Sequence, residues 1–269
     1  MSLSKATEAK QEVESVLRSS PRLYGMKRSR WRLQDIRDQI DWLQTKSLAG
    51  VKHILERLGF SWKQTISFVR SPDPAYQRKV AWFEAIQRQV ELVPEQYVLL
   101  YQDEFSYYQQ PRGTRQYWPT GHSYPKHYRA PAEDALSRIG AMINGLTGQV
   151  IYRQGDKFGT EAMIDLYHMS RLVYPRQQLF VAQDNCPFHK HPKVMAAVRK
   201  LDIIPVFFPT YASWMNPIEK LWRWLRADVL NGHRSAHSLP KLRQLVADFL
   251  DTFSYGSQPL LRYVGLLPD

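Results

Sequence analysis

The chain has 269 residues and a mass of 31.6 kDa, which is enough for one large domain or two smaller ones. Hydrophobic residues make up 43% of it, which excludes a disordered protein because that much apolar surface can form a core. Its single cysteine, Cys186, excludes an internal disulfide and a multi-cysteine zinc site. No apolar run approaches the roughly 18–20 residues of a membrane span, so we expect a soluble cytoplasmic protein with no membrane partner.

The positive charge is concentrated near the N-terminus. The whole chain carries a formal net charge of +12, and residues 1–79 supply +8 of it, with 16 Lys and Arg against 8 Asp and Glu. Such an asymmetry favours a polyanionic partner, most commonly nucleic acid. A basic surface that only keeps the protein soluble is the alternative.

Three helices are predicted before residue 60. Residues 5–18 form a polar helix, and apolar residues from Trp31 to Leu43 recur at helical spacing. A further helix begins after Ser47, a good N-cap, and ends at Gly59. The last two helices, followed by residues 60–63, predict a helix-turn-helix with a strand or wing, although a plain helical hairpin has the same pattern.

If the helix-turn-helix is correct, this region binds DNA. Its second helix would present Lys52 and Arg57 to a DNA groove, while Arg28, Arg30 and Lys63 contact phosphates.

Strands and helices alternate in the rest of the chain. Residues 71–77 contain two prolines and form a linker, and a helix from about residue 76 to 93 follows. We therefore divide the chain into a helical region (1–75), a linker helix (76–95) and an α/β domain (96–269). In the α/β domain, strands are predicted at 97–101, 115–118, 138–143, 149–153, 179–182 and 203–208. Helices are predicted there at 159–174 and 191–200, and two more begin at Pro217 and Leu239. A mixed sheet flanked by helices is expected.

Two buried strands end in the same way. Residues 97–101 are followed by Gln102 and Asp103, and residues 179–182 by Gln183 and Asp184. Ligands of open α/β sheets gather at the carboxyl ends of the strands, so we expect the two aspartates to lie side by side. Carboxylates this close repel each other unless a cation such as Mg²⁺ or Mn²⁺ intervenes. Each aspartate alone also suits a turn or a cap.

A third acid, Glu219, begins a C-terminal helix. Asn216 is a good N-cap, Pro217 suits the first helical position, and Glu219 falls where a capping box places its acid. Spacing alone leaves both roles open, a helix cap and a metal ligand.

Together these residues resemble a known family. Asp103, Asp184-Asn185 and Asn216-Pro217-Ile218-Glu219 are similar to the Asp-Asp-Glu (DDE) triad of the mariner superfamily of transposases, in its bacterial insertion-sequence branch. The 34 residues between Asp184 and Glu219 are typical of that superfamily, and the 187–192 stretch matches it as well. Arg30-Trp31 and residues 58–63 resemble its second DNA-binding unit, so that the similarity covers roughly residues 15–255.

The resemblance implies a fold and a mechanism. The fold is a ribonuclease H-like mixed sheet flanked by helices, preceded by a small helical, winged-helix-like domain. Asp103, Asp184 and Glu219 are its catalytic residues and hold two Mg²⁺ ions, for which Mn²⁺ can substitute. One ion activates a water for phosphodiester cleavage, the other stabilises the leaving 3′ oxygen, and the freed 3′-hydroxyl then attacks target DNA.

The partners implied are the terminal inverted repeats of an insertion element and target DNA, bound as double strands by a homodimer at the bacterial nucleoid. Lys220 and Arg223 flank the expected cleft and can bind phosphates, or they are only surface charges of an amphipathic helix.

One departure from the family keeps other functions open. Its members usually carry a further helix-turn-helix unit, for which the roughly 25 residues before Arg28 are too few. We therefore expect that unit to be lost or encoded separately. The alternatives to a transposase are an inactive or truncated DNA-binding remnant and a ribonuclease H-like nuclease without strand transfer.

Overall fold

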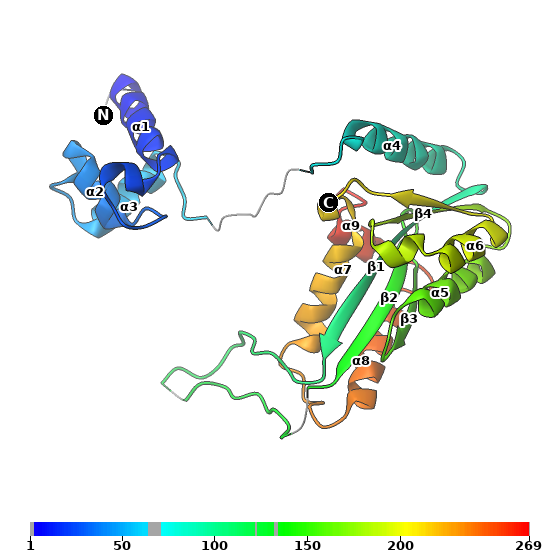
Figure 1. The fold of residues 1–269 in the computed structure, drawn as a ribbon. Helices are drawn as coiled ribbons and strands as arrows, with labels where there is room; N and C mark the ends of the chain where they lie inside the picture. Colours follow the sequence, from blue (N-terminus) through cyan, green and yellow to red (C-terminus); the bar gives the residue numbers. More distant parts are fainter. Residues whose placement is uncertain (1–2, 64–70, 122, 132–133, 269) are drawn as a thin grey trace. The chain divides into compact units, whose positions relative to one another are not determined.

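The computed structural model describes residues 3–63, 71–121, 123–131 and 134–268, and the chain divides into two compact units, Met1–Phe68 and Val69–Asp269 (Figure 1). No helix in these described ranges is both long and apolar enough to cross a membrane.

The N-terminal unit is a small helical domain. It consists of α1 (Leu3–Arg18), α2 (Leu33–Gln39) and α3 (Leu48–Arg57), with 3-10 helices at Pro21–Tyr24 and Asp41–Leu43. Its core is formed by apolar side chains of all three helices and the segments between them, namely Val13, Val16, Trp31, Ile36, Ile40, Leu43, Val51 and Leu55.

The predicted ends of α3 are confirmed. Ser47 caps the helix, since its hydroxyl accepts a hydrogen bond from the N–H of Gly50 at 3.1 Å. Gly59 follows the helix with a φ of +87°, a conformation that favours glycine. Of the expected strand or wing, residues 60–63 form no strand, and residues 64–70 lie outside the described part.

A five-stranded mixed sheet organises the second unit. The strands are β1 (Tyr97–Tyr108), β2 (Leu136–Asn144), β3 (Val150–Gly155), β4 (Gln178–Gln183) and β5 (Ile203–Phe207), in the order β3-β2-β1-β4-β5. The pairs β1–β2 and β2–β3 are antiparallel, whereas β1–β4 and β4–β5 are parallel. The expected mixed sheet is thus confirmed, and residues 144–149 form the predicted hairpin turn between β2 and β3.

Helices cover both faces of the sheet (Figure 1). On one face α5 (Thr160–Val173) and α6 (Pro192–Lys200) pack against β1, β2, β4 and β5. On the other lie α4 (Tyr76–Leu92), α7 (Ile218–Leu225), α8 (Leu239–Asp251) and α9 (Gln258–Val264). A π-helix, Arg226–Leu230, continues α7.

Three expectations for this unit are wrong. Residues 115–118 form no strand, because this part of the β1–β2 connection makes no ladder with another strand. Strand β1 does not end at residue 101: its pairing with β4 stops at Tyr101, but its pairing with β2 continues to Tyr108. A third C-terminal helix, α9, follows the two expected ones.

Helix α4, the expected linker helix, packs on the sheet. Phe83, Ile86 and Val90 form its buried stripe, which joins Tyr101 and Phe208 in one core. The Phe83 ring meets the rings of Tyr101 and Phe208 edge-on, with centroids 6.0 and 5.3 Å apart. This helix is therefore part of the second unit, because its apolar side chains are buried against the sheet of that unit.

We expect Phe83→Ala to lower the free energy of unfolding by about 3 kcal/mol, because it leaves a cavity among packed aromatic rings. Its neighbour Trp82 is 44% exposed, so Trp82→Ala should cost less than about 1 kcal/mol. Urea unfolding followed by circular dichroism measures both values. Equal losses for the two variants would contradict the assignment of α4 to this unit.

Candidate active site

Asp103 lies inside β1, on the face covered by α7. Successive side chains of a strand point to opposite faces, so Asp103 meets α7 whereas Glu104 lies on the side of α5. The indole N–H of Trp222 donates a hydrogen bond of 2.9 Å to Oδ2 of Asp103. Burial, and then the charges of Glu219 and Glu104, raise the pKa of Asp103 to about 8 despite this hydrogen bond. The carboxylate therefore lacks a compensating positive charge.

The second acid, Asp184, follows the end of β4 at the same level of the sheet. Strands β1 and β4 pair Tyr101 with Ala182, so that Asp103 and Asp184 each come two residues after a paired position. Oδ1 of Asp184 accepts a hydrogen bond from the N–H of Cys186 at 2.8 Å and forms an ion pair with His189, whose Nδ1 is 3.2 Å away. The contact with His189 lowers the pKa of Asp184.

Helix α7 brings the third acid, Glu219, to the same edge. Its buried stripe of Ile218, Leu221, Trp222 and Leu225 packs on the sheet. Its start is tied to β1 by Asn216, whose side-chain N–H donates to the carbonyl of Gln102 at 2.8 Å. Among the described residues, no backbone N–H donates to the Glu219 carboxylate, so the capping-box role is not realised.

The charges of the three acids are coupled. Although solvent reaches Glu219, partial burial raises its pKa and Asp184 raises it further, while Arg226 and Arg223 lower it. The negative charge of Glu219 in turn raises the pKa of Asp103. In the part of the chain that the structure describes, no three His, Cys, Asp or Glu side chains already meet around one point. Their oxygen donors and mutual repulsion nevertheless fit a hard divalent cation, which would reverse these shifts.

A buried His189–Glu104 pair, missed in the sequence, supports the site. His189 is 1% exposed, and its Nε2 lies 2.9 Å from Oε1 of Glu104 while its Nδ1 faces Asp184. Burial lowers the pKa of His189, but the hydrogen bonds and charges of Asp184 and Glu104 outweigh it and raise the pKa to about 9. His189 is thus an imidazolium at neutral pH that fixes the position of Asp184.

The predicted DNA-binding residues differ in their surroundings. Arg30, Lys52, Arg57 and Lys63 are exposed in the N-terminal unit. Arg28 instead forms an ion pair with buried Asp35, at 2.7 and 2.9 Å. Asp35 also accepts from the N–H of Arg32 at 2.9 Å, so the pair stabilises the start of α2.

The two predicted phosphate contacts on α7 also differ. Lys220 donates to the carbonyl of Val264 at 2.9 Å and so holds the end of α9. Arg223 is exposed, and its positive charge reaches Glu219. Of the two, only Arg223 has its charge directed toward the acids.

The sequence between β1 and α8 matches a known family. Residues 98–243, which include all three acids, match the model of the DDE superfamily endonuclease. The chain belongs to this superfamily. An insertion element IS630 39 kDa protein of Shigella sonnei is 23% identical over 246 residues, which cover 90% of this chain and 70% of that protein.

Solved structures of a transposase share the fold. The Mos1 transposase paired-end complex with the left transposon end aligns with a TM-score of 0.65 at 15% identity, over 96% of this chain and 75% of Mos1. The Mos1 strand transfer complex aligns with a TM-score of 0.63 at 16% identity, over 96% and 74%. The ribonuclease H-like fold and the expected group, the DDE transposases, are confirmed.

The charge coupling predicts how pH changes the stability of the metal-free protein. Because the pKa of Asp103 is about 8 when folded and about 3.8 when unfolded, the folded state binds more protons between these values. Folding therefore becomes less favourable as the pH rises from about 4 to 8. Asp103→Asn removes this effect, so its Tm relative to wild type should rise by about 4 °C or more between pH 5 and pH 8 in EDTA.

Differential scanning fluorimetry measures these Tm values. Glu95→Gln, an exposed residue ahead of β1, is the matched control and should follow wild type at both pH values. If the difference in Tm between Asp103→Asn and wild type were the same at pH 5 and pH 8, it would contradict the raised pKa of Asp103.

The role of Glu104 is tested through His189. In Glu104→Gln, the pKa of His189 should fall from about 9 toward the ordinary value of about 6.5, since one of its two carboxylate partners loses its charge. NMR titration of the imidazole resonances measures it, with Glu95→Gln as control. An unchanged pKa would show that Glu104 does not stabilise the imidazolium.

Proposed function

We propose that this DDE transposase cuts DNA at the ends of an insertion element and joins the freed 3′ ends to target DNA. The observation that carries the proposal is that Asp103, Asp184 and Glu219 lie near one edge of a ribonuclease H-like sheet, where the charge of Glu219 acts on Asp103 and that of Asp184 on Glu219. The family match spans all three, and the Mos1 complexes with the same fold contain a transposon end or are named for strand transfer.

We propose that these acids hold divalent metal, Mg²⁺ or Mn²⁺, as two ions. When bound, the metal would supply positive charge and Lewis acidity for phosphodiester cleavage. The Mos1 paired-end complex has been solved with Mn, at a TM-score of 0.64, and with Mg, at 0.65, each at 14% identity over 96% of this chain and 75% of Mos1. Carboxylates are the ligands that such hard ions prefer.

The chain's own residues position these ligands. Trp222 fixes one oxygen of Asp103, and His189 and the N–H of Cys186 hold Oδ1 of Asp184. Helix α7 places Glu219 through its buried stripe and through Asn216. Asp103 thus lies on a strand, Asp184 directly follows one, and Glu219 lies on a helix, which position them more precisely than long loops would.

The proposed DNA partners are element ends and target DNA, bound by two copies of the chain together. The positively charged N-terminal residues and exposed α3 side chains such as Lys52 and Arg57 support binding of the DNA backbone. The paired-end Mos1 complexes, which share the fold, support action on two ends at once.

DNA cleavage and joining test the proposal directly. Protein, Mg²⁺ and a duplex carrying the sequences that flank the gene should yield nicks and joined products. Asp184→Asn should reduce both by at least about a thousandfold, whereas Glu95→Gln should react like wild type. The duplexes are analysed on denaturing gels.

Other outcomes select the alternatives. Nicks without joined products would indicate a nuclease without strand transfer. DNA binding without cleavage in Mg²⁺ or Mn²⁺ would indicate an inactive remnant. Equal cleavage by Asp184→Asn and wild type would overturn the assignment of the triad.

A further inference from the structure

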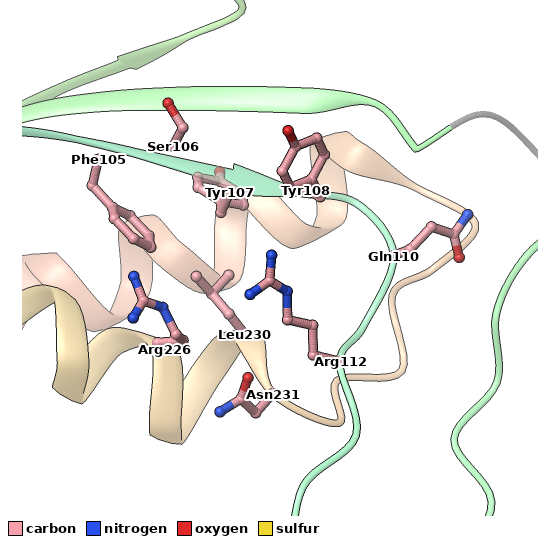
Figure 2. Close-up of a pocket in the computed structure, with 9 residues that line it drawn as sticks. All are labelled: Phe105, Ser106, Tyr107, Tyr108, Gln110, Arg112, Arg226, Leu230 and Asn231. Carbon is pink, nitrogen blue, oxygen red and sulfur yellow. The ribbon is translucent and has the colours of Figure 1, made fainter. Parts of the chain in front are cut away.

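A cavity that the catalytic triad does not use lies between the end of β1 and the π-helix. It is lined by Phe105, Tyr108, Arg112, Arg226 and Asn231, together with Ser106, Tyr107, Gln110 and Leu230. Figure 2 shows the side chains of Arg112 and Arg226 reaching into the space beside Phe105 and Leu230. Two guanidinium groups thus enter one cavity from different segments of the chain.

The cavity is connected to Asp103 and Glu219 through the side chains that line it. Phe105 follows Asp103 by two residues on the same face of β1, and its ring stacks on Trp222, the donor to Asp103, with centroids 5.3 Å apart. Arg226 lies 5.0 Å above the Phe105 ring, and its charge reaches Glu219. A DNA strand that reaches the acids therefore has its next backbone groups within range of this cavity.

Hydrogen bonds fix the walls. The N–H of Asn231 donates to the carbonyl of Arg226 at 2.9 Å, which closes the π-helix. The N–H of Gly232 donates to the carbonyl of Arg112 at 2.9 Å, and Arg112 and Asn231 form a β-bridge. The segment after β1 is thereby tied to the end of the π-helix, so both arginines start from fixed backbone. Single π-turns within helices frequently occur at functional sites.

The charge of the cavity selects an anion. Neither Arg112 nor Arg226 forms an ion pair with an Asp or Glu in the described part of the chain, and no acid lines the cavity. The planar guanidinium matches the oxygens of a phosphate, and arginines supply many of the backbone contacts in protein–DNA complexes.

We propose that Arg112 and Arg226 form a subsite for a backbone phosphate of the DNA strand next to the scissile phosphodiester. The subsite holds the polyanionic strand against three carboxylates that repel it. This inference rests on the proposed function, because it takes DNA as the ligand.

DNA binding without divalent metal tests the subsite, since cleavage is then excluded. We would measure fluorescence anisotropy of a labelled duplex with a recessed 3′ end, at about 50 and about 200 mM salt. Arg112→Gln and Arg226→Gln should each bind about tenfold more weakly at the lower salt. The slope of log K against log salt should also fall by about 0.9 for each lost contact.

The matched control is Arg176→Gln. Arg176 is exposed and precedes β4, at the opposite end of the parallel strands from the acids, so this variant should bind like wild type. The Tm of each variant must equal that of wild type, so that weaker binding is not due to unfolding. Arg112→Lys should keep the wild-type salt slope, because it keeps the charge.

A neutral methylphosphonate placed at successive linkages locates the contact. In the wild-type protein, a methylphosphonate at one or two linkages beside the 3′ end should weaken DNA binding by the same tenfold factor. In the arginine variants, a methylphosphonate at those linkages should cause no further loss of affinity. Binding by Arg112→Gln and Arg226→Gln that equals that of Arg176→Gln would overturn the subsite alone. Absence of DNA binding by wild type would instead overturn the proposed function.

Discussion

The candidate active site depends on the packing of α7 against the middle of β1. Burial of Ile218, Leu221, Trp222 and Leu225 is worth roughly 1.5–3 kcal/mol for each side chain. The same packing buries Asp103 and brings Glu219 toward it, and both effects raise the pKa of Asp103 to about 8. Asp103 is therefore mostly protonated at neutral pH, and ionising it at pH 7 costs about 1.4 kcal/mol. Burial of the apolar stripe of α7 supplies the free energy that holds Glu219 near Asp103 despite this cost.

The acids differ in how the protein compensates them. Asp184 has its own cation, since His189 is held as an imidazolium between it and Glu104, and its pKa is lowered. Asp103 has only the indole N–H of Trp222, and its pKa is raised. Because ligands must lose their protons to bind metal, metal binding should draw its pH dependence mainly from Asp103. Because of this unequal compensation, the charged form is favoured for Asp184 and disfavoured for Asp103 in the absence of a cation.

The sequence predicted the elements whose signals are local. The apolar runs of β1 and β4 and the Gln-Asp pairs after them placed Asp103 and Asp184 at one level, because parallel strands in register bring equivalent positions together. The hairpin between β2 and β3 followed from Asn144 and Gly145 in the turn. Helix α9 had similar signals, a Ser257 cap and Gly265 at its end, but only seven residues, too few for a clear apolar period.

What the sequence could not show depends on contacts between distant residues. The His189–Glu104 pair joins residues 85 positions apart, and no spacing rule links them. Asp103 lies inside a strand rather than after one, because β2 continues the pairing where β4 stops. The charge of Arg28 pointed to phosphate, yet its guanidinium is paired with Asp35. For Glu219 the local pattern suited both a cap and a ligand, and the choice depends on whether a backbone N–H donates to its carboxylate, which none does among the described residues.

Helix α7 and the π-helix that continues it also supply positive charges near the acids. Glu219 begins α7, Arg223 lies one turn further on, and Arg226 opens the π-helix that continues it. Both arginines lower the pKa of Glu219, so they partly offset the repulsion that α7 creates at its start. Arg226 comes four residues, about one helical turn, after Trp222, whose ring stacks on Phe105, and its guanidinium lies over the same Phe105 ring. One helix thus supplies both a carboxylate for metal and a guanidinium beside the path of the phosphate backbone.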